Sequence, residues 1–173
     1  MLEVTLDPRR RPCSNPISSL DSEIAMDMSE NRQASELDGV LADLLDLGLL
    51  AKHARWNVLG PRFWALERTL NELAEFARVS ADSVAERAVT LGHPPDGRAV
   101  TITTRSSLPD VESGALRDAD AITAFLAILD AAATRIHAGL EAFETDLVTA
   151  ALLTNLLATV EKFAWTLRVQ CGP

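Results

Sequence analysis

Four long stretches of this chain repeat apolar residues at three- and four-residue steps, the spacing of one face of an α-helix. The predicted helices cover residues 35–56, 62–91, 118–143 and 147–169. The repeat is clearest in the second stretch, at Leu66, Leu70, Leu73, Ala77, Val84, Ala88 and Leu91. Because each helix must bury its apolar face against another, the pattern predicts an all-α four-helix bundle.

Helix-breaking residues set the connections between these stretches. Gly60-Pro61 predicts a tight turn after the first helix. Residues 93–117 contain three prolines and two glycines, and we expect residues 100–104 to be extended and residues 109–112 to form one or two helical turns. A connection of this length is typical of the crossover in ferritin-like bundles, where the joined helices are not antiparallel neighbours.

The N-terminal residues 1–33 differ from the rest, which defines a predicted bundle domain at 34–173. Their prolines, serines and asparagines predict a mostly irregular tail, with at most a short helix around 22–28.

The apolar residues of the first bundle helix, including Leu45, Leu49 and Leu50, cover more of its surface than a single stripe would. Such a helix buries two faces, and in a domain this small the second face predicts contact with another subunit.

Composition narrows the class of protein further. Of 173 residues, 47% are hydrophobic, which excludes a disordered chain. The formal charge of −9 argues against an indiscriminate nucleic-acid binder, which is normally basic. No uninterrupted apolar run reaches the roughly 18 residues that span a bilayer, and we expect no membrane partner. The N-terminus also lacks the apolar core of a signal peptide, so we expect a cytoplasmic protein.

Asp82 and Glu86 are the first candidates for chemistry. They lie four residues apart and therefore share one helix face, which continues back through Arg78, Asn71 and Glu67. Clustered carboxylate oxygens are the ligands that hard metal cations prefer. The alternative interpretation is a solvated polar face, which needs no ligand.

Three motifs extend this pattern. Residues 53–67 read His53-Ala-Arg-Trp-Asn-Val-Leu-Gly-Pro-Arg-Phe-Trp-Ala-Leu-Glu67, followed by Asp82-Ser-Val-Ala-Glu86-Arg87 and, near the end, Glu161-Lys162-Phe-Ala-Trp165. Together they resemble the signature of the Dps family, the mini-ferritins known as DNA-binding proteins from starved cells. The resemblance covers roughly residues 35–170 and all four predicted helices.

The resemblance implies a hollow homo-oligomeric shell of twelve subunits that oxidises Fe(II), often with peroxide, and stores the ferric mineral inside. Many members also coat DNA, which would place the protein at the nucleoid. The family's oxidation site lies between two subunits related by a twofold axis. One subunit provides two histidines, and the other provides the acids that correspond to Asp82 and Glu86.

This chain departs from that pattern on the histidine side. Arg55 and Glu67 stand where the family has its two histidines, and Asn71 replaces a supporting acid. His53 does not substitute for the missing imidazole, because two residues along a helix turn it about 200° away.

Arg55 is the severe change, because a guanidinium stays protonated and has no lone pair for a metal. At about 4 Å it would repel a divalent ion by roughly 8 kcal/mol at an effective dielectric constant of about 20. We therefore expect Arg55 to bridge Asp82 or Glu86 of the partner subunit, with weak or absent Fe(II) oxidation. The alternative is an all-carboxylate iron site of Glu67, Asp82 and Glu86.

The resemblance also suggests roles outside this site. Trp56 and Trp64 flank it, either as electron donors during oxidation or as packing groups at the dimer interface. Glu144 and Asp146 are candidates for an iron-admitting threefold pore, although Asp146 is equally suited to cap the fourth helix. The triplet Arg9-Arg10-Arg11 is the candidate DNA contact, in a tail whose four arginines and six acids predict weak, salt-sensitive binding.

Overall fold

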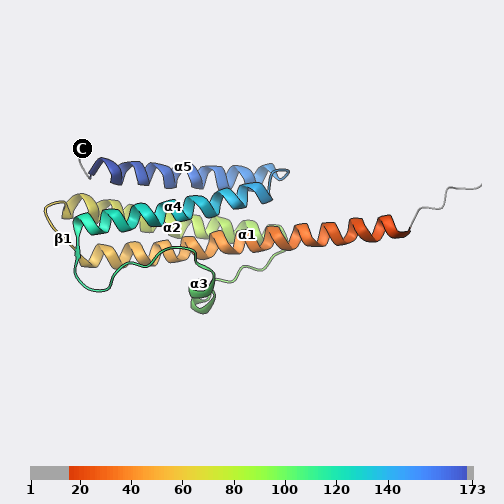
Figure 1. The fold of residues 1–173 in the computed structure, drawn as a ribbon, viewed down its shortest axis with the longest axis horizontal. Helices are drawn as coiled ribbons and strands as arrows, with labels where there is room; N and C mark the ends of the chain where they lie inside the picture. Colours follow the sequence, from red (N-terminus) through yellow and green to blue (C-terminus); the bar gives the residue numbers. More distant parts are fainter. Residues whose placement is uncertain (1–15, 171–173) are drawn as a thin grey trace, which may run out of the picture.

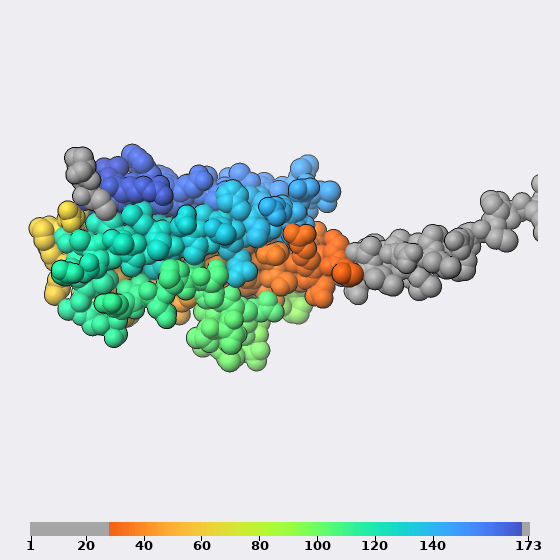
Figure 2. Space-filling view, viewed as in Figure 1, coloured from red at the N-terminus to blue at the C-terminus, as the bar shows by residue number. Residues whose placement is uncertain are grey.

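The computed structural model describes residues 16–170, with side chains from Met28 onward. Four long helices form the bundle: α1 Pro16–Asn57, α2 Phe63–Thr90, α4 Asp118–Ala142 and α5 Leu147–Gln170. The short helix α3, Ala99–Arg105, lies on the crossover between α2 and α4 (Figure 1) and stands out from the side of the bundle in the space-filling view (Figure 2). The predicted ferritin-like four-helix bundle with a long crossover is confirmed.

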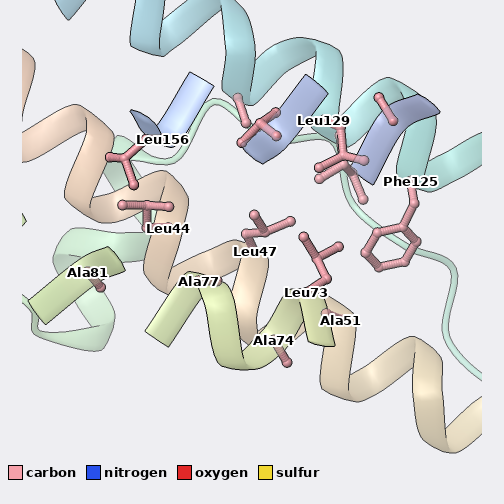
Figure 3. Close-up of a cluster of buried hydrophobic side chains, with 14 of the residues drawn as sticks. Leu44, Leu47, Ala51, Leu73, Ala74, Ala77, Ala81, Phe125, Leu129 and Leu156 are labelled. Carbon is pink, nitrogen blue, oxygen red and sulfur yellow. The ribbon is translucent and has the colours of Figure 1, made fainter. Parts of the chain in front are cut away.

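One continuous apolar core runs between the four helices (Figure 3). Leu47 of α1, Leu73 of α2, Phe125 of α4 and Leu153 of α5 are all completely shielded from solvent. Residues at the predicted three- and four-residue steps face this core because helical periodicity places them on one side. Gly48 of α1 faces Ala77 of α2, and a Cβ added at Gly48 would lie in ordinary van der Waals contact, 3.8 Å from the Ala77 Cβ.

The turn between α1 and α2 is fixed by a two-residue strand pair. Strand β1, Val58–Leu59, pairs in parallel with β2, Leu116–Arg117, just before α4. Asp118, the first residue of α4, is buried and accepts a hydrogen bond from the Arg62 backbone N–H at 3.0 Å. Gly60 has φ of +136°, and a Cβ there would lie 2.6 Å from the Asp118 Cγ. Glycine is therefore required for the turn to close over this carboxylate.

The crossover corrects two predictions. Residues 100–104 belong to helix α3 instead of an extended segment, and residues 109–112 form no helix. Ile102 buries against the bundle, and the Thr103 and Thr104 hydroxyls bond to the Val100 carbonyl within the same turn. This local bonding and burial outweigh the β-propensity of a segment that has no partner strand.

Two acids of α1 anchor the crossover beyond α3. The buried Asp43 carboxylate accepts both the backbone N–H and the hydroxyl of Ser107, each at 2.7 Å. Asp46 accepts the Ser106 hydroxyl, while burial raises the pKa of Asp46 above its usual range. Arg135 of α4 approaches Asp43 at 3.5 Å, so the anchor joins three parts of the fold.

The start of α1 corrects a third prediction. Residues 16–33 continue the helix, whereas an irregular tail was expected there; residues 1–15 lie outside the described part of the chain. After Pro16 no proline or glycine interrupts the sequence before Gly39, and proline itself is favoured in the first helical turn. Once the packed part of α1 is formed, adding turns carries no new nucleation cost. The helix therefore projects past the end of the bundle (Figure 1).

Helices α4 and α5 are long and apolar enough, by length and composition, to cross a membrane. Core helices of soluble bundles pass the same test, and both helices pack through Phe125, Ile136, Leu153 and Leu167 into the core. Part of their apolar surface nevertheless stays open in the single chain, including Trp165 and the residues that begin α5.

Candidate functional site

Asp82 and Glu86 lie on the exposed side of α2, on one face as predicted. The nearest cation to Asp82 is Arg78, whose Nη1 is 3.5 Å from Oδ2, and both side chains are more than 60% exposed. Arg78 is held mainly by Glu75, at 2.7 Å, on the same helix. Among residues 28–170 no cluster of three histidine, cysteine or acidic side chains is placed to hold a metal ion.

Arg55 and Glu67 form a direct ion pair within the chain. The Arg55 Nε donates to Glu67 Oε1 at 2.7 Å, and Nη2 approaches the same oxygen. The side chains are 32% and 26% exposed, so the pair is partly shielded from solvent. The pair forms because the tight turn brings the last turn of α1 back beside the first turns of α2.

A second contact extends this seam between α1 and α2. Lys52 donates to the Asn71 side-chain oxygen at 3.0 Å, one helical turn from the Arg55–Glu67 pair. Sequence reasoning identified Asn71 but missed Lys52, whose spacing of three residues from Arg55 was the available signal. Arg55 and Glu67, at the positions where the resemblance implies two histidines, thus form an ion pair. Asn71, at the position of the supporting acid, accepts a hydrogen bond from Lys52.

The aromatic candidates lie at the same end of the molecule. Trp56 is 74% exposed and Trp64 is 79% exposed, and the ring of Phe63 meets Trp64 edge-on at 5.2 Å. Neither indole is buried within the chain, so a packing role for them requires a second molecule.

The pore candidates differ from one another. Glu144 is exposed. Asp146 binds Arg87 at 2.6 Å and accepts N–H groups of Val148 and Thr149 at the start of α5, which is the alternative capping role. Burial opposes ionisation of Asp146, but hydrogen bonds from Thr149 and Arg87 outweigh it and lower its pKa to about 2. Arg87 was not predicted as a partner, although it directly follows Glu86.

None of the histidines forms a metal-binding cluster with the acid pair in the described part of the chain. His53 Nε2 is 3.3 Å from the Glu112 carbonyl oxygen on the crossover, and His137 is exposed on α4. The candidate DNA contacts Arg9, Arg10 and Arg11 lie outside the described residues.

Comparison with known proteins defines the family. The model of the ferritin-like domain matches residues 34–172. DNA protection during starvation protein 2 of Deinococcus radiodurans is 35% identical over 155 residues, covering 89% of this chain and 64% of that protein. The corresponding Mycolicibacterium smegmatis protein is 33% identical, covering 80% of this chain and 78% of its own. The crystal structure of a Dps from Deinococcus radiodurans superposes with a TM-score of 0.78 at 34% identity, over 82% of this chain and 87% of that one. This chain belongs to the Dps family of ferritin-like proteins.

Another Dps structure, from Microbacterium arborescens in a high-iron form, superposes with the same TM-score of 0.78 at 29% identity. It covers 84% of this chain and 95% of the other. This chain thus shares the Dps bundle over nearly its whole described length. It spans less than two thirds of the Deinococcus radiodurans relative, so that protein's full activity does not transfer with the fold.

Proposed function

We propose that this chain is a subunit of a cytoplasmic Dps-type shell of twelve copies that binds and stores iron and protects against oxidative stress. Its own Fe(II) oxidation is weak or absent. The shell accounts for the apolar side chains that one chain leaves open, such as Leu49, Trp56, Trp64 and Trp165. Twelve copies of an 18.7 kDa chain give about 220 kDa by light scattering.

The observation that carries the proposal is the Arg55–Glu67 ion pair. Iron is the substrate here, and Asp82 and Glu86 offer the oxygen ligands that it accepts. The opposing half of a Dps site offers instead a guanidinium and the carboxylate bound to it at 2.7 Å. An all-carboxylate site that includes Glu67 is disfavoured, because Fe(II) would have to displace Arg55 and then remain beside its charge.

The expected bridge from Arg55 to Asp82 or Glu86 of the partner subunit stays a prediction. Within its own chain, Arg55 is held by Glu67. Under the proposed assembly this pairing reduces the charge that Arg55 presents to the acid pair across the interface. This arrangement closes the histidine half and leaves the acid half unaltered.

The decisive experiment restores the imidazoles. The variant Arg55→His/Glu67→His should oxidise Fe(II) with peroxide at a saturable rate, while the native shell stays near the uncatalysed background. The matched control, Arg68→His/Glu72→His, replaces an exposed ion pair of α2 outside the site and should gain nothing. Saturable oxidation by the native shell, with about two irons per site, would refute the proposal.

DNA compaction is the weaker candidate activity. Its only basic candidates are Arg9, Arg10 and Arg11, in a chain of net charge −9. We expect no gel shift of duplex DNA at physiological salt, because a few phosphate contacts are screened there.

Glu144 remains the candidate pore acid, and replacing it with alanine should slow iron loading.

A further inference from the structure

The crossover between α2 and α4 is fixed to the bundle by a cluster of polar side chains just after α3, here called the crossover anchor. Asp43 accepts the backbone N–H and the hydroxyl of Ser107, each at 2.7 Å, and Asp46 accepts the hydroxyl of Ser106 at 2.5 Å. Arg135 of α4 completes the anchor at 3.5 Å from Asp43. Because the anchor directly follows α3, these bonds determine how firmly α3 is held against the side of the bundle (Figure 2).

The guanidinium of the anchor is already occupied. Arg135 lies across α1 beside Gly39, where an added Cβ would lie 3.0 Å from its Nη1. From there its Nε faces Asp43, and its Nη2 donates to the Arg105 carbonyl oxygen at the end of α3, at 3.4 Å. The side chain of Arg105 in turn approaches Asp38 at 3.9 Å. Both arginines therefore serve other groups.

Asp46 has no cationic partner. Among residues 28–170, no lysine, arginine or histidine side chain forms an ion pair with it, although its carboxylate is partly buried. Burial raises the pKa of Asp46 above 3.8; the Ser106 hydrogen bond opposes this rise, and the like charges of Asp110 and Asp43 add to it. Asp110 belongs to the crossover, and Asp43 lies one turn earlier on α1. The ionised form of Asp46 is thus the less favourable one while the crossover is closed.

We propose that Asp46 makes the crossover anchor a pH-sensitive switch, which holds the crossover and α3 tightly when Asp46 is protonated and loosens when Asp46 is ionised. The proton removes the repulsion of Asp46 by Asp110 and Asp43. The neutral carboxyl keeps a carbonyl oxygen that accepts the Ser106 hydroxyl, so this bond survives protonation. Opening of the crossover instead separates Asp46 from Asp110 and lets water solvate the charge. The switch lies within one chain, so it requires neither the shell nor iron.

The direction of the switch follows from the linkage between protonation and opening. The closed crossover raises the pKa of Asp46, so the closed state binds the proton more tightly than the open state does. This stabilisation of the closed state is fully present below the ordinary aspartate pKa of 3.8 and is lost as the pH rises through the raised value. Acidification therefore tightens the crossover. The opposite holds for Asp146, whose lowered pKa makes strong acid weaken the cap of α5.

Hydrogen exchange of the full-length protein, followed by mass spectrometry, measures this opening. Protection factors of peptides covering residues 99–111 would be compared from about pH 4 to about pH 7.5, after correction for the chemical exchange rate at each pH. Circular dichroism over the same range confirms that the bundle stays folded. In the native chain the protection of the crossover should fall as the pH rises, whereas peptides of α5 should keep the same protection.

The variant Asp46→Asn separates a switch from a merely structural bond. Asparagine is neutral at every pH and keeps an amide oxygen for the Ser106 hydroxyl. This variant should therefore be better protected than the native chain at about pH 7.5 and should lose the pH dependence. Asp110→Asn removes one repelling charge and leaves the Ser106 bond intact, so it should weaken the dependence without abolishing it. The matched control, Asp130→Asn, neutralises an exposed aspartate of α4 and should retain the native dependence.

Three results would overturn the inference. Protection of the native crossover that is independent of pH, or that rises with pH, would show that ionisation of Asp46 does not loosen the anchor. An Asp46→Asn crossover that is less protected than the native one at about pH 7.5 would show that the anchor needs the negative charge as its acceptor. None of these results concerns Fe(II) oxidation, so the proposed function stands or falls on its own experiment.

Discussion

Gly60 should be among the least replaceable residues of the turn that sets the Arg55–Glu67 pair. A Cβ added there would lie 2.6 Å from the Cγ and 2.7 Å from Oδ2 of Asp118, well inside van der Waals contact. The backbone, at φ of +136°, also disfavours any residue but glycine, at a cost of about 1–3 kcal/mol. If the Asp118 carboxylate moved away, its hydrogen bond from the Arg62 N–H would break, which lowers the free energy of unfolding by about 1.5–3 kcal/mol. The Gly60→Ala change should therefore destabilise the fold by about 3–5 kcal/mol.

The matched control is Gly114→Ala. Gly114 also has positive φ, +91°, but a Cβ there would meet nothing within 4 Å, so this variant reports the backbone term alone. Urea unfolding followed by circular dichroism, at one protein concentration, should show Gly60→Ala losing at least about 2 kcal/mol more than Gly114→Ala. In an Asp118→Ala background that excess should vanish. Equal losses in both glycine variants would refute the assignment of the cost to Asp118.

Three further outcomes are expected. Asp146→Asn should lower the free energy of unfolding by about 1–2 kcal/mol at pH 7, because it weakens the ion pair with Arg87 and the cap of α5. The pKa of Asp146 is lowered from 3.8 to about 2, so this stabilisation is present above pH 4 and is lost as the pH falls through 2. Unfolding measured during acid titration of both proteins checks this. Asp43→Ala should speed hydrogen exchange around Ser107 by removing both acceptors of the crossover anchor, with α5 as the unaffected reference. A double-mutant cycle of Arg55→Met and Glu67→Gln should give a coupling energy of about 1 kcal/mol; additive effects would mean that the pair is not formed in solution.

The bundle was predictable because its information is local. Helical periodicity identified core residues such as Leu66, Leu70 and Val84 without knowledge of any contact. Helix α3 was not predictable in this way, because Ile102 and the surrounding threonines favour a strand until α1 offers a surface to pack against. The extension of α1 through residues 16–33 was missed because sparse apolar residues were taken as absence of helix, although no breaker interrupts them.

The site shows the same division between local and long-range information. Spacing correctly placed Asp82 and Glu86 on one face of α2, since both belong to one helix. The partner of Arg55 was not accessible, because its distance to Glu67 depends on how the turn at Gly60 folds α2 back along α1. The Lys52–Asn71 and Arg87–Asp146 contacts, which also join different helices, were missed for the same reason.

Under the proposed function, Arg55 and Glu67 are best explained as a pair, because each compensates the charge of the other. Arginine alone would place an uncompensated cation at a subunit interface, and glutamate alone would add a third carboxylate to the facing Asp82 and Glu86. Together, Arg55 and Glu67 add no net charge relative to two neutral imidazoles and satisfy each other's hydrogen-bonding groups. Under the proposed assembly, the interface therefore keeps its charge balance without the metal chemistry.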